Sequence, residues 1–395
     1  MTTAAIAPAD TEAHERRITV ALFAAGLTTF ASMYSAQALL PSLSAEFGAT
    51  PASAALAVSL TTGLLAVAIV PMSVLSDRFG RTRVMIGSAG AAAVIGLVLP
   101  FSPTLDVLLT GRAIQGVVLA GVPAVAMAYL AEEIGAAGLG SAMGIYVAGT
   151  SLGGLTGRLI PAFTLEVGSW RWGLAAIGVA AAVCAGIFVR MVPPSRRFDA
   201  RRLEIGRVAA DFAGHLRDRT LLPLFGLAFV MMGGFVSVYN FLGYRLTRAP
   251  FGLSAATVGL VFVLYLAGTA TAANAGRMTN RLGRSRVLTL GLIAMGIGLL
   301  LTLPDMLPII LLGVLLCTAG FFAVHAVASG WVGAAATGNR AAASALYLCA
   351  YYLGSSIAGG VGGLAYGHFG WTGLAAYVAV LVVLAGGLVA TLTTR

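Results

Sequence analysis

Long apolar segments separated by short polar ones extend along almost the whole chain. A helix needs about 20 apolar residues to cross a bilayer, and polar clusters, Pro and Gly divide this chain into twelve segments of about that length. The strict alternation of apolar and polar residues that marks barrel strands is missing. We therefore predict an all-α integral membrane protein whose twelve transmembrane helices occupy residues 18–40, 53–75, 84–101, 104–130, 139–162, 171–192, 220–243, 254–276, 287–303, 306–329, 340–361 and 371–392.

One long polar stretch divides these spans into two sets of six. Five apolar residues within it are spaced to line one face of a short helix on the membrane surface, and they are Leu203, Ile205, Val208, Phe212 and Leu216. The predicted domains are an N-terminal tail at 1–17, a six-helix bundle at 18–192, a central loop at 193–219 and a second six-helix bundle at 220–395.

The two sets of six spans resemble each other. Residues 76–84 read SDRFGRTRV and follow the second span, and residues 279–287 read TNRLGRSRV and follow the eighth, at an offset of 203. The pairs Ser141-Ala142 and Ser344-Ala345 keep the same offset at the start of the fifth and eleventh spans. Two parallel halves related by an axis along the membrane normal are a transporter architecture. The repeat therefore predicts two pseudo-symmetric six-helix bundles.

Charge then gives the chain an orientation. The chain has 395 residues, of which 59% are hydrophobic and 10% charged, and this composition excludes soluble and disordered proteins. All 24 basic residues are Arg; 19 lie in loops on the side of the termini, and only Arg171, Arg245 and Arg248 lie on the other side. The positive-inside rule places the termini and the central loop in the cytoplasm. The expected location is the inner membrane of a bacterium. The basic residues therefore contact membrane lipids and not nucleic acid.

No enzyme constellation is present in the sequence. The absence of Lys excludes Schiff-base chemistry and a Walker-type nucleotide loop. The cysteines and histidines are scattered, at Cys184, Cys317, Cys349, His14, His215, His325 and His368. We therefore expect no metal, no cofactor and no catalytic residue.

The loop after the second span resembles the first signature of the major facilitator superfamily, Gly-x-x-x-Asp-Arg/Lys-x-Gly-x-Arg/Lys-Arg/Lys. Residues 73–83 read SVLSDRFGRTR, so Ser73 replaces the leading Gly and Thr82 separates the last two arginines. The resemblance covers nearly the whole chain and implies the major facilitator fold, with an acidic residue that latches the halves on the cytoplasmic side. The gate residues that it implies are Asp77, Arg78, Gly80, Arg81, Glu132 and Glu133. Independently, Gly80 would permit a tight turn.

Span four carries a second family-like pattern, Leu108-x-x-x-Arg112-x-x-Gln115-Gly116. Arg112 lies eight residues into the span, or about 12 Å at 1.5 Å per residue. A charge at that depth is costly unless it faces a polar cavity or a partner. The resemblance implies a role in proton coupling, and we expect Arg112→Ala to abolish transport while membrane insertion stays intact.

Span five resembles the glycine motif of the family's antiporters. Gly140, Gly149, Gly153 and Gly157 keep its register, but Arg158 stands where the last Gly is expected. Glycines at this spacing let two helices approach closely and would give a flexible seam, so Gly149, Gly153 and Gly157 are the predicted hinge. The motif favours export over uptake. For Arg158 three roles stay open: binding an anionic substrate, pairing with Glu166 or Asp106, or reaching the membrane interface.

A substrate site in this architecture lies near mid-membrane, between the halves. Apolar walls with few polar anchors suit a lipophilic ligand. The predicted substrate-binding residues are Tyr34, Gln37, Arg112, Tyr146, Tyr239, Asn240, Tyr265, Tyr347 and Tyr351. None of the 14 acidic residues lies in the middle of a span, so Arg112, His325 and Asp77 are the candidates for proton coupling.

Together these features predict a monomeric secondary transporter of the drug and sugar efflux type. It would export a small lipophilic solute by alternating access in exchange for protons. Two alternatives stay open: a facilitator or importer on the same scaffold, and a non-transporting membrane sensor or lipid-handling protein.

Overall fold

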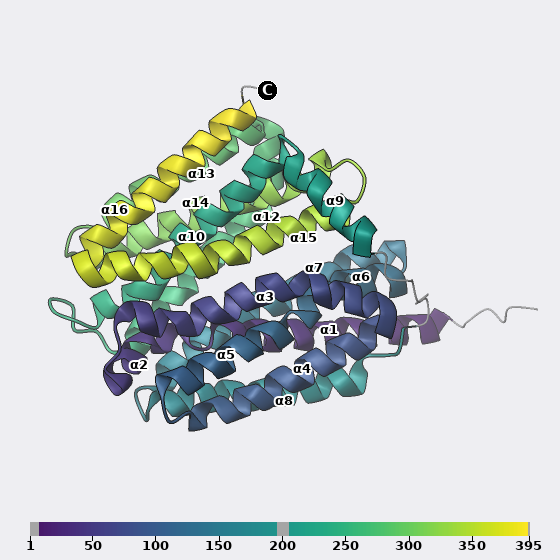
Figure 1. The fold of residues 1–395 in the computed structure, drawn as a ribbon, viewed down its shortest axis with the longest axis horizontal. Coiled ribbons are helices and arrows are strands. Elements are labelled where there is room, and N and C mark those ends of the chain that lie inside the picture. Colours follow the sequence, from purple (N-terminus) through teal and green to yellow (C-terminus); the bar gives the residue numbers. More distant parts are fainter. Residues whose placement is uncertain (1–7, 196–204, 394–395) are drawn as a thin grey trace, which may run out of the picture.

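A computed structural model describes residues 8–195 and 205–393, and within these ranges the only regular structure is helical (Figure 1). The first half contains α1 (Pro8–Tyr34), η1 (Gln37–Leu39), α2 (Leu40–Phe47), α3 (Pro51–Phe79), α4 (Arg81–Val98), η2 (Leu99–Phe101), α5 (Leu105–Leu119), α6 (Gly121–Glu133), α7 (Ala136–Thr164) and α8 (Trp170–Met191). The second half contains α9 (Ile205–Arg217), α10 (Leu221–Leu246), α11 (Ala255–Gly259), η3 (Leu260–Leu264), α12 (Tyr265–Leu282), α13 (Arg284–Leu301), α14 (Leu307–Ala335), α15 (Arg340–Leu353), η4 (Gly354–Ala358) and α16 (Gly359–Thr393).

The predicted all-α membrane fold is confirmed. Ten helical segments of the described chain are long and apolar enough to cross a membrane. The last of them, Arg340–Leu392, turns back at Gly370, where φ is 63°, and therefore crosses twice. The glycine-rich α7, which carries Arg158 and has 29 residues, is not among these ten segments and supplies the remaining crossing. Ten segments, one extra crossing and α7 give the twelve crossings that the sequence predicts.

Several bounds differ from the predicted ones. The first crossing continues to Phe47, beyond the predicted end at residue 40, because the chain turns at residues 35–36 and then resumes as η1 and α2. At the other end α1 already begins at Pro8, so part of the predicted tail is helical. Residues 1–7 of that tail lie outside the described part.

The central segment contains a helix where the sequence suggests one. α9 packs against α10 and α15 of the second half. His215 Nε2 lies 3.0 Å from the Asn339 carbonyl oxygen, and Asn339 Nδ2 donates to Asp211 Oδ2 at 2.8 Å. This helix is therefore attached to the second bundle. Leu203, which would extend its apolar face, lies outside the described residues.

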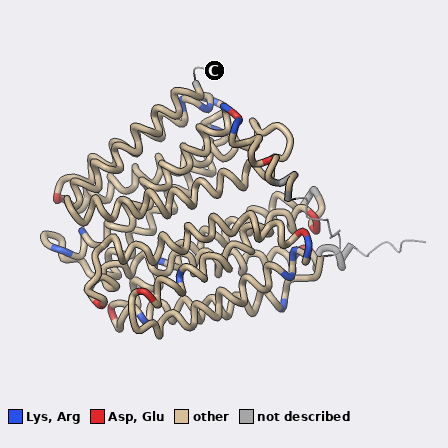
Figure 2. Tube along the Cα trace, in the orientation of Figure 1, with Lys and Arg blue, Asp and Glu red and all other residues tan. Residues whose placement is uncertain are grey.

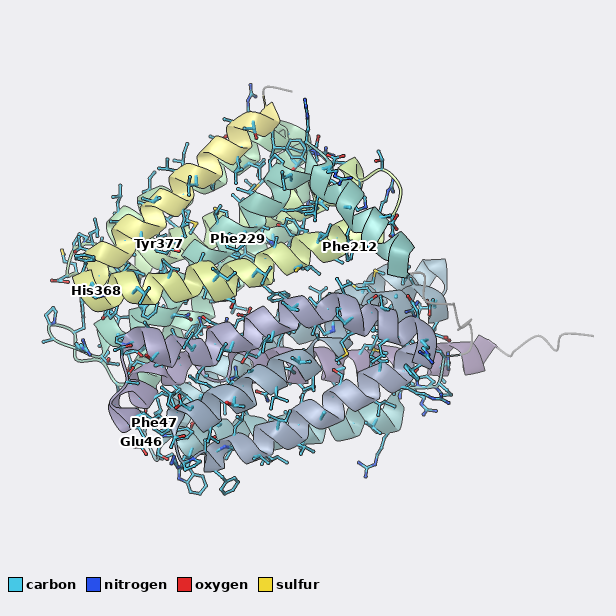
Figure 3. All side chains as sticks on the ribbon, viewed as in Figure 1. Glu46, Phe47, Phe212, Phe229, His368 and Tyr377 are labelled. Atoms are coloured by element: carbon cyan, nitrogen blue, oxygen red, sulfur yellow. The ribbon has the colours of Figure 1, made fainter. Side chains whose placement is uncertain are left out.

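Charged residues gather at the two ends of the molecule, with few between them (Figure 2). We call the end with the α3–α4 and α12–α13 turns the basic end. The opposite end holds Glu46, Phe47 and His368 (Figure 3) and is called the closed end. The two basic-end turns have matching backbones, with φ 99° and ψ 143° at Gly80 and φ 81° and ψ 156° at Gly283. Both glycines have the positive φ that a residue with a Cβ rarely adopts, and they stand at the offset of 203.

The two bundles touch closely at the closed end. The Tyr244 hydroxyl donates to the Leu40 carbonyl oxygen at 2.8 Å and lies 2.7 Å from Ser44 Oγ. The Ala256 N–H donates to Glu166 Oε1 at 2.8 Å. Each contact joins one half to the other. From there α3 runs beside the first part of α16, then η4 and then α15, and α3 and α15 separate toward the basic end (Figure 1).

Candidate functional site

A cavity of about 580 Å³ lies between the two halves. Its walls come from α1 and α7 of the first half and from α10, α12, α14 and α15 of the second. The lining is mostly aromatic and aliphatic, and its residues are Phe23, Phe30, Tyr34, Gly144, Val147, Ala148, Thr150, Ser151, Leu152, Gly154, Leu155, Arg158, Met232, Phe235, Tyr265, Leu266, Thr269, Phe322 and Tyr351. One charged side chain, Arg158, lies among them, and no acidic residue does.

The guanidinium of Arg158 lies at the end of this cavity that is nearer the closed end of the molecule. The residue is only 3% exposed, so it does not reach the membrane interface. Its Nη1 donates to the Gly154 carbonyl oxygen at 2.6 Å, and its Nη2 donates to the Tyr265 hydroxyl at 3.3 Å. The Cζ atom lies 3.9 Å from the ring centroid of Tyr34 and 4.6 Å from that of Tyr265. Aromatic faces therefore stabilise part of this buried charge.

Arg158 also begins a chain of amides that joins the halves. Its Nε donates to Gln37 Oε1 at 2.5 Å, and Gln37 Nε2 donates to Asn240 Oδ1 at 2.6 Å. Because an arginine can only donate, the oxygen of Gln37 faces it and the Gln37 amide group must donate onward. Asn240 is 1% exposed, and its Nδ2 has no hydrogen-bond partner in the described structure. Gln37 and Asn240 stand at the offset of 203, so they occupy equivalent positions in the two halves.

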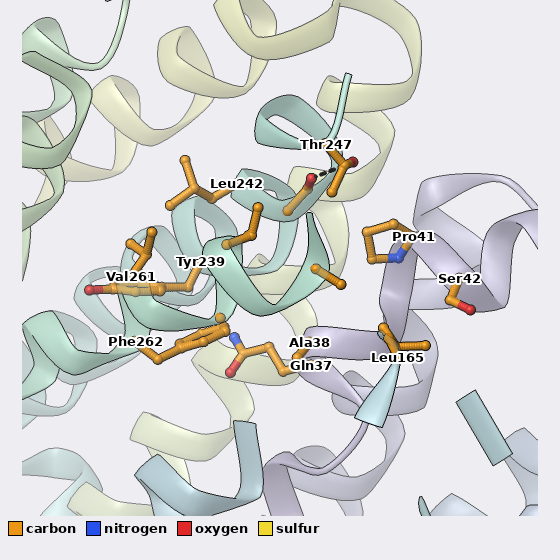
Figure 4. Close-up of a pocket in the computed structure, with 14 residues that line it drawn as sticks. Gln37, Ala38, Pro41, Ser42, Leu165, Tyr239, Leu242, Thr247, Val261 and Phe262 are labelled. Atoms are coloured by element: carbon orange, nitrogen blue, oxygen red, sulfur yellow. Dashed lines mark hydrogen bonds between the residues drawn. The ribbon is translucent and has the colours of Figure 1, made fainter. Parts of the chain in front are cut away.

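A smaller cavity of about 220 Å³ lies beyond this layer, toward the closed end (Figure 4). Gln37, Tyr239 and Phe262 line it, together with Pro41 and residues of α11. Arg158 borders the larger cavity, whereas its partner Gln37 borders the smaller one. The arginine and its amide partner therefore form a polar layer between two cavities.

Arg112 occupies a different environment. The residue is 0% exposed and lines neither of these cavities. Its Nη1 and Nη2 donate to the carbonyl oxygens of Ser32 at 2.8 Å and Met33 at 2.6 Å, and its Nε donates to that of Ala57 at 2.9 Å. Ser32 and Met33 belong to the last turn of α1, whose carbonyls have no partner in the helix. Arg112 therefore acts as a cationic cap inside the first bundle, and its predicted contact with substrate has no counterpart in this conformation.

The predicted tyrosines separate into three groups. Tyr34, Tyr265 and Tyr351 line the larger cavity, and Tyr239 lines the smaller one. Tyr146 is buried in the apolar core of the first bundle, away from both.

The third group contains Tyr347 and the proton-coupling candidate His325. The Tyr347 hydroxyl lies 3.0 Å from His325 Nδ1. The His325 ring lies 4.7 Å from the ring of Tyr351, so a cavity-lining tyrosine stands beside the histidine. His325 itself does not line the larger cavity.

At the basic end the structure brings together three residues of the predicted gate, Asp77, Arg81 and Glu132. Arg81 Nη1 donates to Asp77 Oδ1 at 2.5 Å, and its Nη2 donates to Glu132 Oε1 at 2.9 Å. All three residues belong to the first half. Glu133 lies apart, with Oε2 3.9 Å from His14 Nε2, and Arg78 lies over the ring of Phe79. The role of this group as a gate stays a prediction.

The predicted hinge glycines let α7 approach α1 very closely. A Cβ at any of them would collide with the α1 backbone. The facing pairs are Gly149–Phe23, Gly153–Leu27 and Gly157–Ala31. Both members advance by four residues, which is the ridge spacing of closely packed helices. The glycines therefore have a packing role, and the hinge role stays a prediction.

Two features of the site were not in the predicted set. For Arg158 the sequence leaves three roles open, and its position inside span five is the signal for a buried one. The closed-end contact of Glu166 was missed altogether. The N–H of Ala256 and the hydroxyl of Ser254 lower the pKa of this carboxyl, because both donate to its charged form. In the sequence Glu166 resembles any exposed loop acid.

Comparisons with known proteins agree with this architecture. The model of the Major Facilitator Superfamily matches residues 22–249 and 224–395. The chain is 41% identical over 370 residues to the uncharacterized MFS-type transporter YybF of Bacillus subtilis, covering 94% of this chain and 92% of that protein. It is 43% identical over 369 residues to the inner membrane transport protein YnfM of Escherichia coli, covering 93% and 88%.

Solved structures share the fold at low sequence identity. A variant of the nucleoside transporter NupG superposes with a TM-score of 0.78 at 13% identity, covering 95% of this chain and 99% of that one. The human organic anion transporter MFSD10 superposes with a TM-score of 0.71 at 20% identity, with the same coverage.

Proposed function

Because the chain belongs to the major facilitator superfamily and is a membrane transporter of that family, we propose that it exports a small lipophilic solute by alternating access, in exchange for protons. The observation that carries the proposal is the cavity between the two halves, which lies on the basic side of the polar Arg158 layer. Such a cavity is accessible from one side at a time if the halves rock about it.

The proposed orientation places the basic end in the cytoplasm of a bacterium, with both termini there and the spans in the inner membrane. The 19 arginines on that side support it, because cytoplasmic loops carry the excess of basic residues. In this orientation the structure is closed toward the outside, and its larger cavity lies on the cytoplasmic side of the closed layer. One chain supplies both halves of the cavity, so the proposed functional unit is the monomer.

A second observation supports export in exchange for protons. The close glycine seam between α1 and α7 occupies the register that resembles antiporters. For the coupling step we retain Asp77, Arg112 and His325 as candidates. Asp77 is the acid among them, and it stands at the basic end next to Arg81.

Everted membrane vesicles test the direction and the coupling. A panel of lipophilic toxicants is first screened for compounds whose toxicity rises when the gene is deleted and falls when it is overexpressed. We expect such a compound to accumulate in energised everted vesicles with an acidic lumen, and nigericin, which collapses the pH gradient, to abolish the accumulation. Vesicles from the deletion strain are the control. Accumulation that continues after nigericin would contradict proton exchange.

A facilitator is the second candidate, and one observation favours it. No acidic residue lines the larger cavity, so no carboxylate there can alternate between proton and substrate. Counterflow of the same compound without any gradient, together with no uphill accumulation, would select this alternative.

A further inference from the structure

The Arg158 charge has no anionic partner in the described structure. No carboxylate oxygen of the described residues lies within 4.0 Å of its nitrogens, and no acidic residue lines the cavity that it borders. The pairing with Glu166 or Asp106, one of the three roles that the sequence leaves open, is therefore not formed in this conformation. A buried cation without a counter-ion is costly inside a membrane, and such residues mark substrate or ion pathways.

The guanidinium also keeps unused donors. Arginine has five N–H groups, and three of them are occupied by Gln37, Gly154 and Tyr265. The Tyr34 hydroxyl is a further hydrogen-bonding neighbour of the guanidinium, and the unused donors belong to the terminal nitrogens Nη1 and Nη2. A guanidinium N–H that the protein does not use can form a charge-assisted hydrogen bond with a carboxylate oxygen.

The neighbouring amides hold the Arg158 side chain and add no acceptor to the larger cavity, since neither Gln37 nor Asn240 lines it. Hydrogen bonds run from Arg158 to Gln37 and from Gln37 to Asn240, so each oxygen in the chain is already an acceptor. The group left over at the far end is the Asn240 amide nitrogen, which is also a donor. A cationic ligand would therefore meet a like charge, whereas an anionic ligand would meet the unused donors of Arg158.

The rest of the cavity is apolar. Phe30, Phe235, Phe322 and Tyr351 face the same space as Arg158. A volume of about 580 Å³ has room for an aromatic or short aliphatic group.

We propose that the transported solute is a small amphipathic organic anion whose acid group pairs with Arg158 while its apolar part lies against the aromatic wall. The inference deepens the proposed function and rests on it for the act of transport, but the binding itself is measurable without transport.

The test compares three ligands of one shape: 2-naphthoate, neutral 2-naphthamide and cationic 2-naphthylmethylammonium. Their affinities for the purified full-length protein in detergent are measured by ligand-dependent thermal stabilisation. We expect 2-naphthoate to bind at least about tenfold more tightly than 2-naphthamide, because a charge-assisted pair is formed only with the acid. The ammonium compound should bind more weakly than either.

Variants test whether the preference for 2-naphthoate depends on Arg158. In Arg158→Gln the preference for 2-naphthoate over 2-naphthamide should disappear, and in Arg158→Lys, which keeps the charge but not the fork, it should shrink. Arg190→Gln removes an exposed arginine at the end of α8 and should keep the full preference. Monodisperse gel filtration of each variant shows that it folds, and the lysine variant decides the result if the glutamine variant does not fold.

Equal binding of the acid and the amide by the wild type, tighter binding of the ammonium compound, or an unchanged preference in Arg158→Gln would each overturn the proposal. So would failure of 2-naphthoate, naphthalene-2-sulfonate and dodecanoate alike to stabilise the wild type. Tighter binding of dodecanoate than of 2-naphthoate would support the anion site and identify a membrane-derived acid as its source. Binding as expected without vesicle transport would instead reject the proposed function and leave the site intact.

Discussion

The two arginines inside the membrane spans occupy opposite environments. Arg112 is enclosed by backbone carbonyls of its own bundle, which it caps where α1 breaks. Arg158 is held by side chains from other spans, two of them aromatic, and faces a cavity. The presence of an arginine inside a span therefore does not by itself indicate its role. The role depends on which groups accept hydrogen bonds from the guanidinium: backbone carbonyls of one bundle, or side chains beside a cavity.

The two arginines also differ in whether their contacts are kept when the two halves move against each other. The partners of Arg112 lie within one bundle, so they are kept when the two halves rock against each other. Arg158 contacts Tyr265 of the second half directly and reaches Asn240 through Gln37. Its environment must change when the closed end opens. Arg112 is thus suited to stabilise one bundle, whereas the contacts of Arg158 depend on how the two bundles are placed relative to each other.

Replacing Arg112 should have the largest effect on stability. Arg112→Met removes the donor of the Met33 carbonyl and of Gln115 Oε1. We expect a loss of about 3 kcal/mol, because each unpaired buried group costs about 1–3 kcal/mol. The measurement is the apparent Tm in detergent and the yield of monodisperse protein. Arg158→Met should lower the Tm less. A stable, inserted Arg112→Met protein that only fails to transport would restore the functional role predicted from the sequence.

Gly153→Ala should have the next largest effect on stability, because Gly153 packs directly against the backbone of α1. A Cβ at Gly153 would meet the backbone carbonyl of Leu27, and overpacking of this kind costs about 1–3 kcal/mol. Gly140→Ala is the matched control on the same helix, since nothing lies within 4 Å of its added Cβ. Equal Tm values for the two alanine variants would show that the seam is not tightly packed.

A smaller effect is expected from the amide pair. Gln37→Leu and Asn240→Leu each break the hydrogen bond between equivalent positions, and the double variant should show a coupling of about 1 kcal/mol. The four proteins are compared by Tm. Additive losses would mean that the pair contributes nothing to closure and that Arg158 is oriented without it.

Glu166→Gln should have the smallest effect, and one that depends on pH. The carboxyl pKa is lowered when the closed end is formed, so closure is favoured above the ordinary carboxyl pKa and weakened as pH falls through the lowered value. Accessibility of a cysteine at Thr247, in the smaller cavity, to a water-soluble thiol reagent measures this opening. Acid should increase labelling in the parent and change it less in Glu166→Gln. An unchanged acid response would remove Glu166 from the closure, and Asp106→Asn is the control at the same end.

The sequence is sufficient for the features that follow from local pattern. Apolar length predicts the twelve crossings, and the repeated loop predicts the matching turns at Gly80 and Gly283. The contact between Asp77 and Arg81 crosses the turn at Gly80, because Asp77 lies near the end of α3 and Arg81 begins α4.

The remaining features depend on packing between distant segments. Nothing local shows that α1 breaks after Tyr34 and exposes carbonyls to Arg112. Likewise, the position of Arg158 among aromatic rings requires α1, α7 and α12 to meet, and these are far apart in the chain. The repeat offset of 203 shows that Gln37 and Asn240 occupy equivalent positions. Their contact, however, depends on how the two bundles pack against each other.

The contact between Gln37 and Asn240 has a consequence for how the two halves could diverge. In a symmetric dimer of two identical halves, a residue on the twofold axis meets its own copy. An amide suits that place, because it both donates and accepts and so can satisfy itself. The position equivalent to Arg158 is Val361, an uncharged residue. Because only the first half carries an arginine at this position, the surroundings of the self-complementary amide pair are not symmetric. The site is charged on the side of the first half and neutral on the side of the second.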